Sequence, residues 1–269
     1  QRQMCIRDRA PDDLARELSI SEDKAELLLP TAMIYHNIFE ETDAEFMWLS
    51  GITICDGMAA DFAECKEHIV PAHPFSDDII SVSRKLAERF CCDTEHIHQV
   101  EIAALKLFDA LRKANHLTKK DRLLLQIAAI LHNCGSFLNL NDIGENSYKI
   151  VTSTEIIGLS HQERMIVAYV IRYTTGDFPE YSEIKNEFSR EEYIKIAKLN
   201  AILCLADAMD RSHQQKFTNF TVRKRGYDLT ITGQTLYDIT LEHGMFIQKS
   251  PFFEEAFGIR PVLRQKKCL

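Results

Sequence analysis

The stretch Leu131-His132-Asn133-Cys134-Gly135 ends an apolar run with the three-to-four residue spacing of a helix. At the start of that run, Thr118-x-x-Asp121 is a capping pattern, because the two side chains can bond the first free N–H groups of a helix. The sequence therefore predicts a helix that ends at His132. A lone histidine there is most often structural, since imidazole also pairs with backbone carbonyls. Its interpretation depends on what other segments place beside it.

Helix-start patterns recur on both sides of this run. Ser76 is expected to cap a helix that ends at Phe90. A second helix is expected over about 93–114, where apolar residues again recur every three to four positions. Ser160-x-x-Glu163 and Ser189-x-x-Glu192 are capping boxes that begin two more. The centre of the chain is therefore predicted to be all helical.

The segment before this helical region has a different pattern. Residues 11–42 are typical of two helices, and Phe46–Leu49 is a short strand candidate. Asp56-Gly57 is expected to form a turn after it. A helix, a strand and a glycine turn in that order indicate the end of an α/β domain.

The segment after the helical region alternates with a period close to two. Three strands are expected, at Phe217–Val222, Tyr227–Thr232 and Leu236–Leu241. A helix interrupted near Pro251 and a last strand at Ile259–Leu263 would follow. About fifty residues make a marginal core alone, so this tail is expected to pack on the helical region.

The predicted fold is mainly α, in four parts. The first nine residues, Gln1 to Arg9, resemble translated adapter sequence, and we expect a non-native leader here. The expected parts are 1–10 as the leader, 11–70 as the end of an α/β domain, 71–213 as a helical domain and 214–269 as a small α+β domain.

Composition excludes several classes of protein. The 269 residues carry a formal net charge of −8, which argues against a nucleic-acid partner recognised by bulk charge. No apolar run approaches the length of a bilayer span, so no membrane is expected. The eight cysteines form no Cys-x-x-Cys pair, which favours a reducing cytoplasm. Adjacent Cys91 and Cys92 indicate a helix end with one side chain in and one out; a redox switch is the alternative.

His132 and Asn133 resemble the His-Asp pair of HD-type metal phosphohydrolases. In those proteins the pair joins a distant His and a distant Asp around a divalent metal that activates water. His96 and Asp207 are the matching candidates here, so the candidate metal ligands are His96, His132 and Asp207. Asn133 replaces the aspartate, and a neutral amide is a poor ligand for a hard cation. We therefore expect this degenerate HD site to bind metal weakly or not at all.

Basic side chains gather at the start of the same helix. Lys119, Lys120 and Arg122 are the candidate phosphate-binding residues, because helix N–H donors and the helix dipole lie beside them. A solvated surface is the alternative. Two further groups could also contact a phosphate chain: the run Arg223 to Arg225, and Arg264, Lys266 and Lys267 near the C-terminus.

The chain resembles the C-terminal portion of the exopolyphosphatase/guanosine pentaphosphate phosphatase family, Ppx/GppA. Residues 11–70 would then end an actin-like phosphatase domain, and the helical domain would be HD-like. The family normally has Gly-Leu-Arg-Glu-Gly where this chain has Gly51-Ile52-Thr53-Ile54-Cys55-Asp56-Gly57. The later histidines of the family correspond to Ile143, Gly144, Asn146 and Thr174. The resemblance rests on 25–32 with 51–57, on 96–111, on 131–148 and on 206–213.

The resemblance implies a hydrolase of phosphoanhydride bonds in inorganic polyphosphate or guanosine pentaphosphate. It also implies magnesium for the full-length enzyme, none in this chain, and a homodimer of the full-length form. The catalytic elements would lie upstream of this chain, so it has no expected catalytic residue. Three hypotheses remain: a part of that hydrolase that completes its substrate groove, a catalytically silent HD fold that binds phosphate-rich ligands, and an independent metal phosphohydrolase, against which Asn133 argues.

Overall fold

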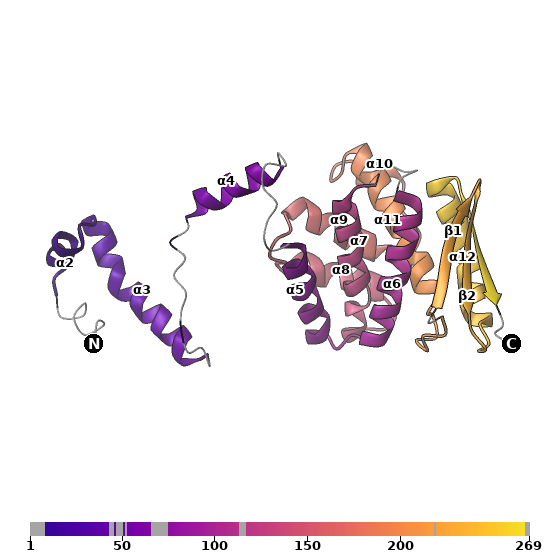
Figure 1. Ribbon diagram of the computed structural model, residues 1–269, viewed down its shortest axis with the longest axis horizontal. Coiled ribbons are helices and arrows are strands. Elements are labelled where there is room, and N and C mark those ends of the chain that lie inside the picture. The colour runs from indigo at the N-terminus through magenta and orange to yellow at the C-terminus, as the bar shows by residue number, and fades with distance from the viewer. Residues whose placement is uncertain are drawn as a thin grey trace. The chain divides into compact units, whose positions relative to one another are not determined.

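The computed structural model describes residues 9–42, 46, 51, 53–65, 75–112, 117–217 and 219–266, apart from the side chains of 64 and 65. The chain divides into two compact units, Gln1–Pro71 and Ala72–Leu269 (Figure 1). Within the described residues, no helix is both long enough and apolar enough to cross a bilayer. Each unit is taken by itself below.

The first unit is helical in its described part. Its helices are α2 (Pro11–Leu18), α3 (Glu22–Glu40) and α4 (Ile54–Cys65). Ser19 ends α2 with a left-handed backbone, at φ 53°. The buried cluster that the described residues form here is small, and it joins Leu14, Ala15 and Ala25. Apolar side chains such as Leu27 and Ile34 are about 60% exposed, so the described residues give this unit little core.

The two helices predicted over 11–42 are confirmed, but the turn at Asp56-Gly57 is wrong. Asp56 lies in the first turn of α4, and its carboxylate accepts hydrogen bonds from the N–H and the hydroxyl of Thr53, at 2.8 and 2.7 Å. Asp56 therefore completes a helix cap instead of a turn. Of the predicted strand Phe46–Leu49, all but Phe46 lies outside the described residues.

The second unit is a helical bundle followed by a small sheet (Figure 1). The capping boxes predicted at Thr118, Ser160 and Ser189 are all present, each with its reciprocal backbone bonds. The prediction that Ser76 caps a helix is wrong, because Ser76 lies within α5 and not before it. The helical elements are α5 (Phe75–Arg89), α6 (Thr94–Leu111), α7 (Lys119–Leu131), η2 (Cys134–Phe137), α8 (Ile143–Ser153), α9 (His161–Arg172), α10 (Tyr181–Ile184) and α11 (Arg190–Ala208).

The core of this unit lies between α6, α7, α9 and α11. Leu107, Leu125 and Leu203 are completely buried there, and each such side chain stabilises the fold by about 1.5–3 kcal/mol. Cys91 is exposed and Cys92 buried at the end of α5, as predicted. The cysteines whose side chains the structure describes are free: Cys55, Cys91, Cys92, Cys134 and Cys204. The Cys92 and Cys134 sulfurs lie 3.4 Å apart.

The tail is a three-stranded sheet in the order β1-β2-β3. β1 (Asn219–Arg225) and β2 (Asp228–Gln234) form an antiparallel hairpin, and β3 (Arg260–Lys266) pairs parallel to β2. A parallel neighbour needs a crossover, which α12 (Thr240–Phe257) supplies. The tail belongs to the same compact unit as the bundle.

Two predictions for the tail are wrong. Leu236–Leu241 is not a strand, because α12 begins at Thr240. The carboxylate of Asp238 accepts from the Thr240 N–H at 3.0 Å and stabilises that helix start. The helix is also continuous through Pro251, where an interruption was expected.

Candidate functional site

Three helix ends bring the predicted metal ligands together. His96 lies in the first turn of α6, where the carboxylate of the N-cap residue Asp93 accepts from its backbone N–H. His132 is the C-cap of α7. Asp207 lies in the last turn of α11. Ligand atoms of His96, His132 and Asp207 all lie within 4.8 Å of one another, so the structure brings the three candidate ligands together.

The three atoms that face one another are two imidazole nitrogens and one carboxylate oxygen. Nε2 of His96 and Nε2 of His132 are 3.2 Å apart. Asp207 Oδ1 lies 3.4 Å from the first nitrogen and 3.6 Å from the second. Both imidazoles are buried, at 1% and 4% exposure, so water screens this cluster weakly.

The outer nitrogen of each ring fixes its orientation. Nδ1 of His96 donates to the Asp210 carboxylate at 2.9 Å, and Nδ1 of His132 donates to the Ala129 carbonyl at 2.8 Å. If both Nε2 atoms were then unprotonated, their lone pairs would repel each other. A proton or a cation must therefore lie between the two rings and Asp207. These outer bonds are also the kind that orient metal-bound histidines.

Without a metal, the proton fills that position. Burial lowers the pKa of His96, but its hydrogen bonds and charge interactions with Asp207 and Asp210 outweigh burial and raise the pKa to about 9. Burial raises the pKa of Asp207, but the facing imidazoles of His132 and His96 hold it well below its ordinary value. The cluster is then a protonated imidazole between carboxylates.

The spacing also suits three ligands of one ion. Zinc binds imidazole nitrogen and carboxylate oxygen at about 2.0–2.2 Å, so two of its ligands lie about 3–3.5 Å apart. The donor set is less suited to magnesium, which prefers oxygen ligands, than to a borderline transition metal. Asn133 lines the same cavity as the cluster and adds no negative charge. The residues fit zinc better than they fit magnesium.

The cluster opens on a cavity of about 240 Å³. Arg211 borders it, with Nη1 3.7 Å from Asp207 Oδ2. Guanidinium, imidazolium and hydroxyl groups donate to phosphate oxygens, so this cavity can hold a phosphoryl group without a metal. Ile143 and Thr174, two positions where the family resemblance places histidines, also line it. The other lining residues include Ser136, Leu140, Thr175 and His213.

Three residues of this site were not predicted. Asp210 bonds His96, Arg211 approaches Asp207, and the ring of His213 stacks on His96 with centroids 3.6 Å apart. The sequence signal for Asp210 was its place three residues after Asp207, in the turn that follows α11.

The predicted phosphate-binding residues lie at the opposite end of α7 from His132. That helix has 13 residues, which corresponds to roughly 20 Å at 1.5 Å per residue. Lys120 forms an ion pair with Glu163, and Arg122 forms a two-bond pair with Asp109 at 2.9 and 3.1 Å. Lys119 is exposed. Two of the three cations are thus already paired, and their assignment as phosphate contacts stays a prediction.

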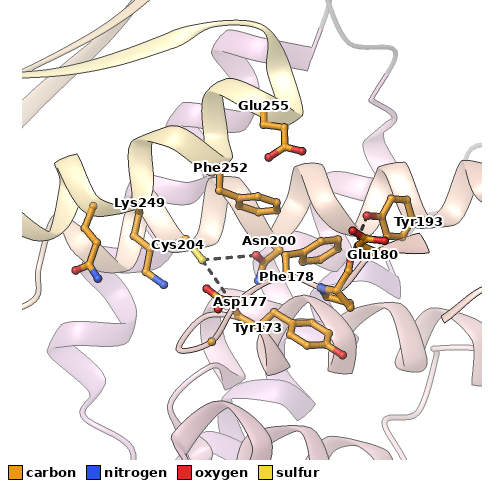
Figure 2. Close-up of a pocket in the computed structure, with 13 residues that line it drawn as sticks. Tyr173, Asp177, Phe178, Glu180, Tyr193, Asn200, Cys204, Lys249, Phe252 and Glu255 are labelled. Atoms are coloured by element: carbon orange, nitrogen blue, oxygen red, sulfur yellow. Dashed lines mark hydrogen bonds between the residues drawn. The ribbon is translucent and has the colours of Figure 1, made fainter. Parts of the chain in front are cut away.

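A second cavity, of about 450 Å³, lies between α11, α12 and the loop after α9 (Figure 2). Its buried polar groups are satisfied within the fold: Asn200 donates to the Val170 carbonyl and Lys249 to the Thr174 carbonyl. Asp177, Glu180 and Glu255 bring negative charge to its lining. Those carboxylates oppose binding of an anion in this second cavity.

The second unit is thus a helical bundle in which three helix ends bring two histidines and an aspartate together. The family model described as Ppx/GppA phosphatase, domain III matches residues 80–248, which include the cluster, its cavity and the β1–β2 hairpin. The chain belongs to the Ppx/GppA phosphatase family. A search of curated proteins found no match.

Proposed function

We propose that this chain is the C-terminal part of a phosphatase that hydrolyses phosphoanhydride bonds of inorganic polyphosphate or guanosine pentaphosphate. Its role in that enzyme is to bind the phosphate chain, and hydrolysis belongs to residues outside it. The match to domain III of the family carries this proposal. The cluster cavity supports it, because it offers cationic and hydroxyl donors beside a single ligand carboxylate.

The first unit supports a larger domain around residues 11–70. α3 and α4 expose Leu27, Ile34 and Phe62, each to 60% or more. Leu27 and Ile34 are seven residues apart and share one face of α3, and exposed apolar side chains that share a face are typical of a surface that another part of a protein covers. The predicted end of an actin-like domain would place them in its core.

The α7 surface can be tested by releasing its cations from their partners. We expect Asp109→Asn with Glu163→Gln to tighten polyphosphate binding, because the double variant frees Arg122 and Lys120 without adding a cation. Glutamine can keep the capping role of Glu163. Binding of labelled polyphosphate by fluorescence anisotropy measures the change.

Reversal of Lys119, Lys120 and Arg122 to glutamate is the complementary variant, and it should weaken binding and flatten the salt dependence. If neither variant changes the affinity or its salt dependence, α7 presents only a solvated surface.

The metal prediction has its own test at Asn133. We expect Asn133→Asp to strengthen manganese or zinc binding at least tenfold, because it restores an anionic ligand beside the cluster. Calorimetry measures the affinity, with His132→Ala in the same background as the control that should abolish the gain. Tight metal binding by the unaltered chain that is lost in His132→Ala would overturn the expectation of a weak site. An unchanged affinity in Asn133→Asp would show that residue 133 does not face the cluster.

A further inference from the structure

One face of the three-stranded sheet carries mainly polar side chains, whereas the other face is apolar and buried. Phe220, Leu229, Ile231 and Leu263 are buried on the inner face. Alternate residues of each strand face the other way. We call this the outer face. It comprises Asn219, Thr221, Arg223 and Arg225 of β1, Asp228, Thr230, Thr232 and Gln234 of β2, and Arg260, Val262, Arg264 and Lys266 of β3.

The outer face is strongly basic in a chain of net charge −8. Arg223, Arg225, Arg264 and Lys266 are exposed. Within the described part of the chain, none of these four cations has an ion pair. The acid of this face, Asp228, is paired with Arg260 at 3.0 Å. A local positive field of this kind attracts anions against the overall charge of the chain.

The register places the four cations on a diagonal. Arg223 and Arg225 lie toward one end of β1, opposite Thr230 and Asp228. Arg264 and Lys266 lie toward the other end of β3, where β2 carries Thr232 and Gln234. With strands about 4.8 Å apart and residues about 3.3 Å apart, the diagonal is roughly 20 Å long.

Polar side chains of β2 lie between the two pairs of cations. Thr230 and Thr232 supply hydroxyl donors along the diagonal, and Gln234 supplies an amide. A hollow of about 420 Å³ lies on this face. It is lined by Asn219, Phe220, Thr221, Arg223, Thr232, Gln234 and Lys266. Cations at both ends and neutral donors between them suit a linear polyanion.

We propose that the outer face binds an extended inorganic phosphate chain, held by Arg223, Arg225, Arg264 and Lys266. The inference rests on the proposed function for its ligand and adds a binding surface separate from the cluster and from α7. A nucleic acid strand fits less well, because its bases need aromatic rings to stack on. The outer face carries none, and Tyr227 lies in the hairpin turn outside these rows. The cations and hydroxyls match the oxygens of a bare phosphate chain.

The test compares two fourfold variants of the full chain. One changes Arg223, Arg225, Arg264 and Lys266 to glutamine. The matched control changes four other exposed cations that have no ion pair among the described residues, Lys85, Arg89, Lys185 and Arg190, to glutamine. Both variants lose the same charge. Fluorescence anisotropy measures binding of long labelled polyphosphate at low and moderate salt, and circular dichroism confirms that both variants fold.

We expect the outer-face variant to bind at least tenfold more weakly. Its slope of log affinity against log salt should be smaller by about 3, if each cation releases counterions as in single-stranded nucleic acid complexes. The control should stay within twofold of the unaltered chain.

Equal losses in both variants, or no loss in either, would overturn the outer-face site and leave the proposed function standing. Absence of binding by the unaltered chain would overturn both. Single-stranded RNA of equal charge bound as tightly, with the same dependence on the four cations, would make this face a nucleic acid surface instead.

Discussion

Replacing His96 with alanine is expected to lower the free energy of unfolding by about 3–5 kcal/mol. The imidazole lies 2.9 Å from Asp210 and 3.4 Å from Asp207. Its removal leaves the buried Asp210 carboxylate and the partly buried Asp207 carboxylate without the cation between them, and breaking a buried pair costs energy on this scale. Urea unfolding followed by circular dichroism measures the loss.

His98 provides the control, because it is an exposed histidine two residues further along α6. His98→Ala should change the unfolding free energy by less than about 0.5 kcal/mol. The folded pKa of His96 is about 9, above its ordinary 6.5. Its contribution is therefore fully present below pH 6.5 and is lost as the pH rises through 9. In EDTA-treated protein the deficit of His96→Ala should be larger at pH 6 than at pH 10. Equal effects of the two substitutions would contradict the cluster as a buried charge network.

Gly144→Ala is expected to destabilise the fold by at least about 2 kcal/mol. A Cβ on Gly144 would clash with the backbone carbonyl oxygen of Arg172 and lie 2.8 Å from Thr175 Oγ1. Backbone atoms cannot rotate away from such a clash, so the helices would have to separate. The same contact explains why this position, where the resemblance places a family histidine, has no room for a side chain here. Thermal and urea unfolding measure the change.

Gly244→Ala is the matched control, since it makes the same substitution inside another helix. A Cβ there meets nothing within 4 Å, and alanine is a better helix former than glycine by about 0.5–1 kcal/mol. We therefore expect opposite signs, with Gly244→Ala stabilising. A Gly144→Ala variant as stable as the unaltered chain would mean that α8 does not pack as closely on Arg172 and Thr175 as the structure places them.

The helical bundle could be predicted because its signals are local. A serine or threonine with an acid three residues later needs only its own backbone to form a cap, and all three such boxes are present at Thr118, Ser160 and Ser189. The predicted family was confirmed by the domain III match. The order of His96, His132 and Asp207 along the chain matches that of an HD site, and the structure brings the three side chains into one cluster.

Other features depend on contacts that a pattern does not specify. Asp56-Gly57 resembles a turn, but the carboxylate of Asp56 bonds Thr53 and caps a helix. Apolar and polar residues alternate over Leu236–Leu241 as in a strand. In the structure, Leu236 and Tyr237 are exposed and α12 begins at Thr240. The pairing of Lys120 with Glu163 joins two helices and could not be read from either segment alone.

Phosphate release from polyphosphate by the purified chain tests the central claim most directly. The unaltered chain is incubated with polyphosphate and magnesium, then with manganese, beside His132→Ala and Asp207→Asn. We predict that it binds polyphosphate, with an affinity that rises with chain length and falls with salt, and that phosphate release stays at background in every sample. Release above background that His132→Ala or Asp207→Asn abolishes would contradict the claim, because it would make the cluster a hydrolytic centre of its own.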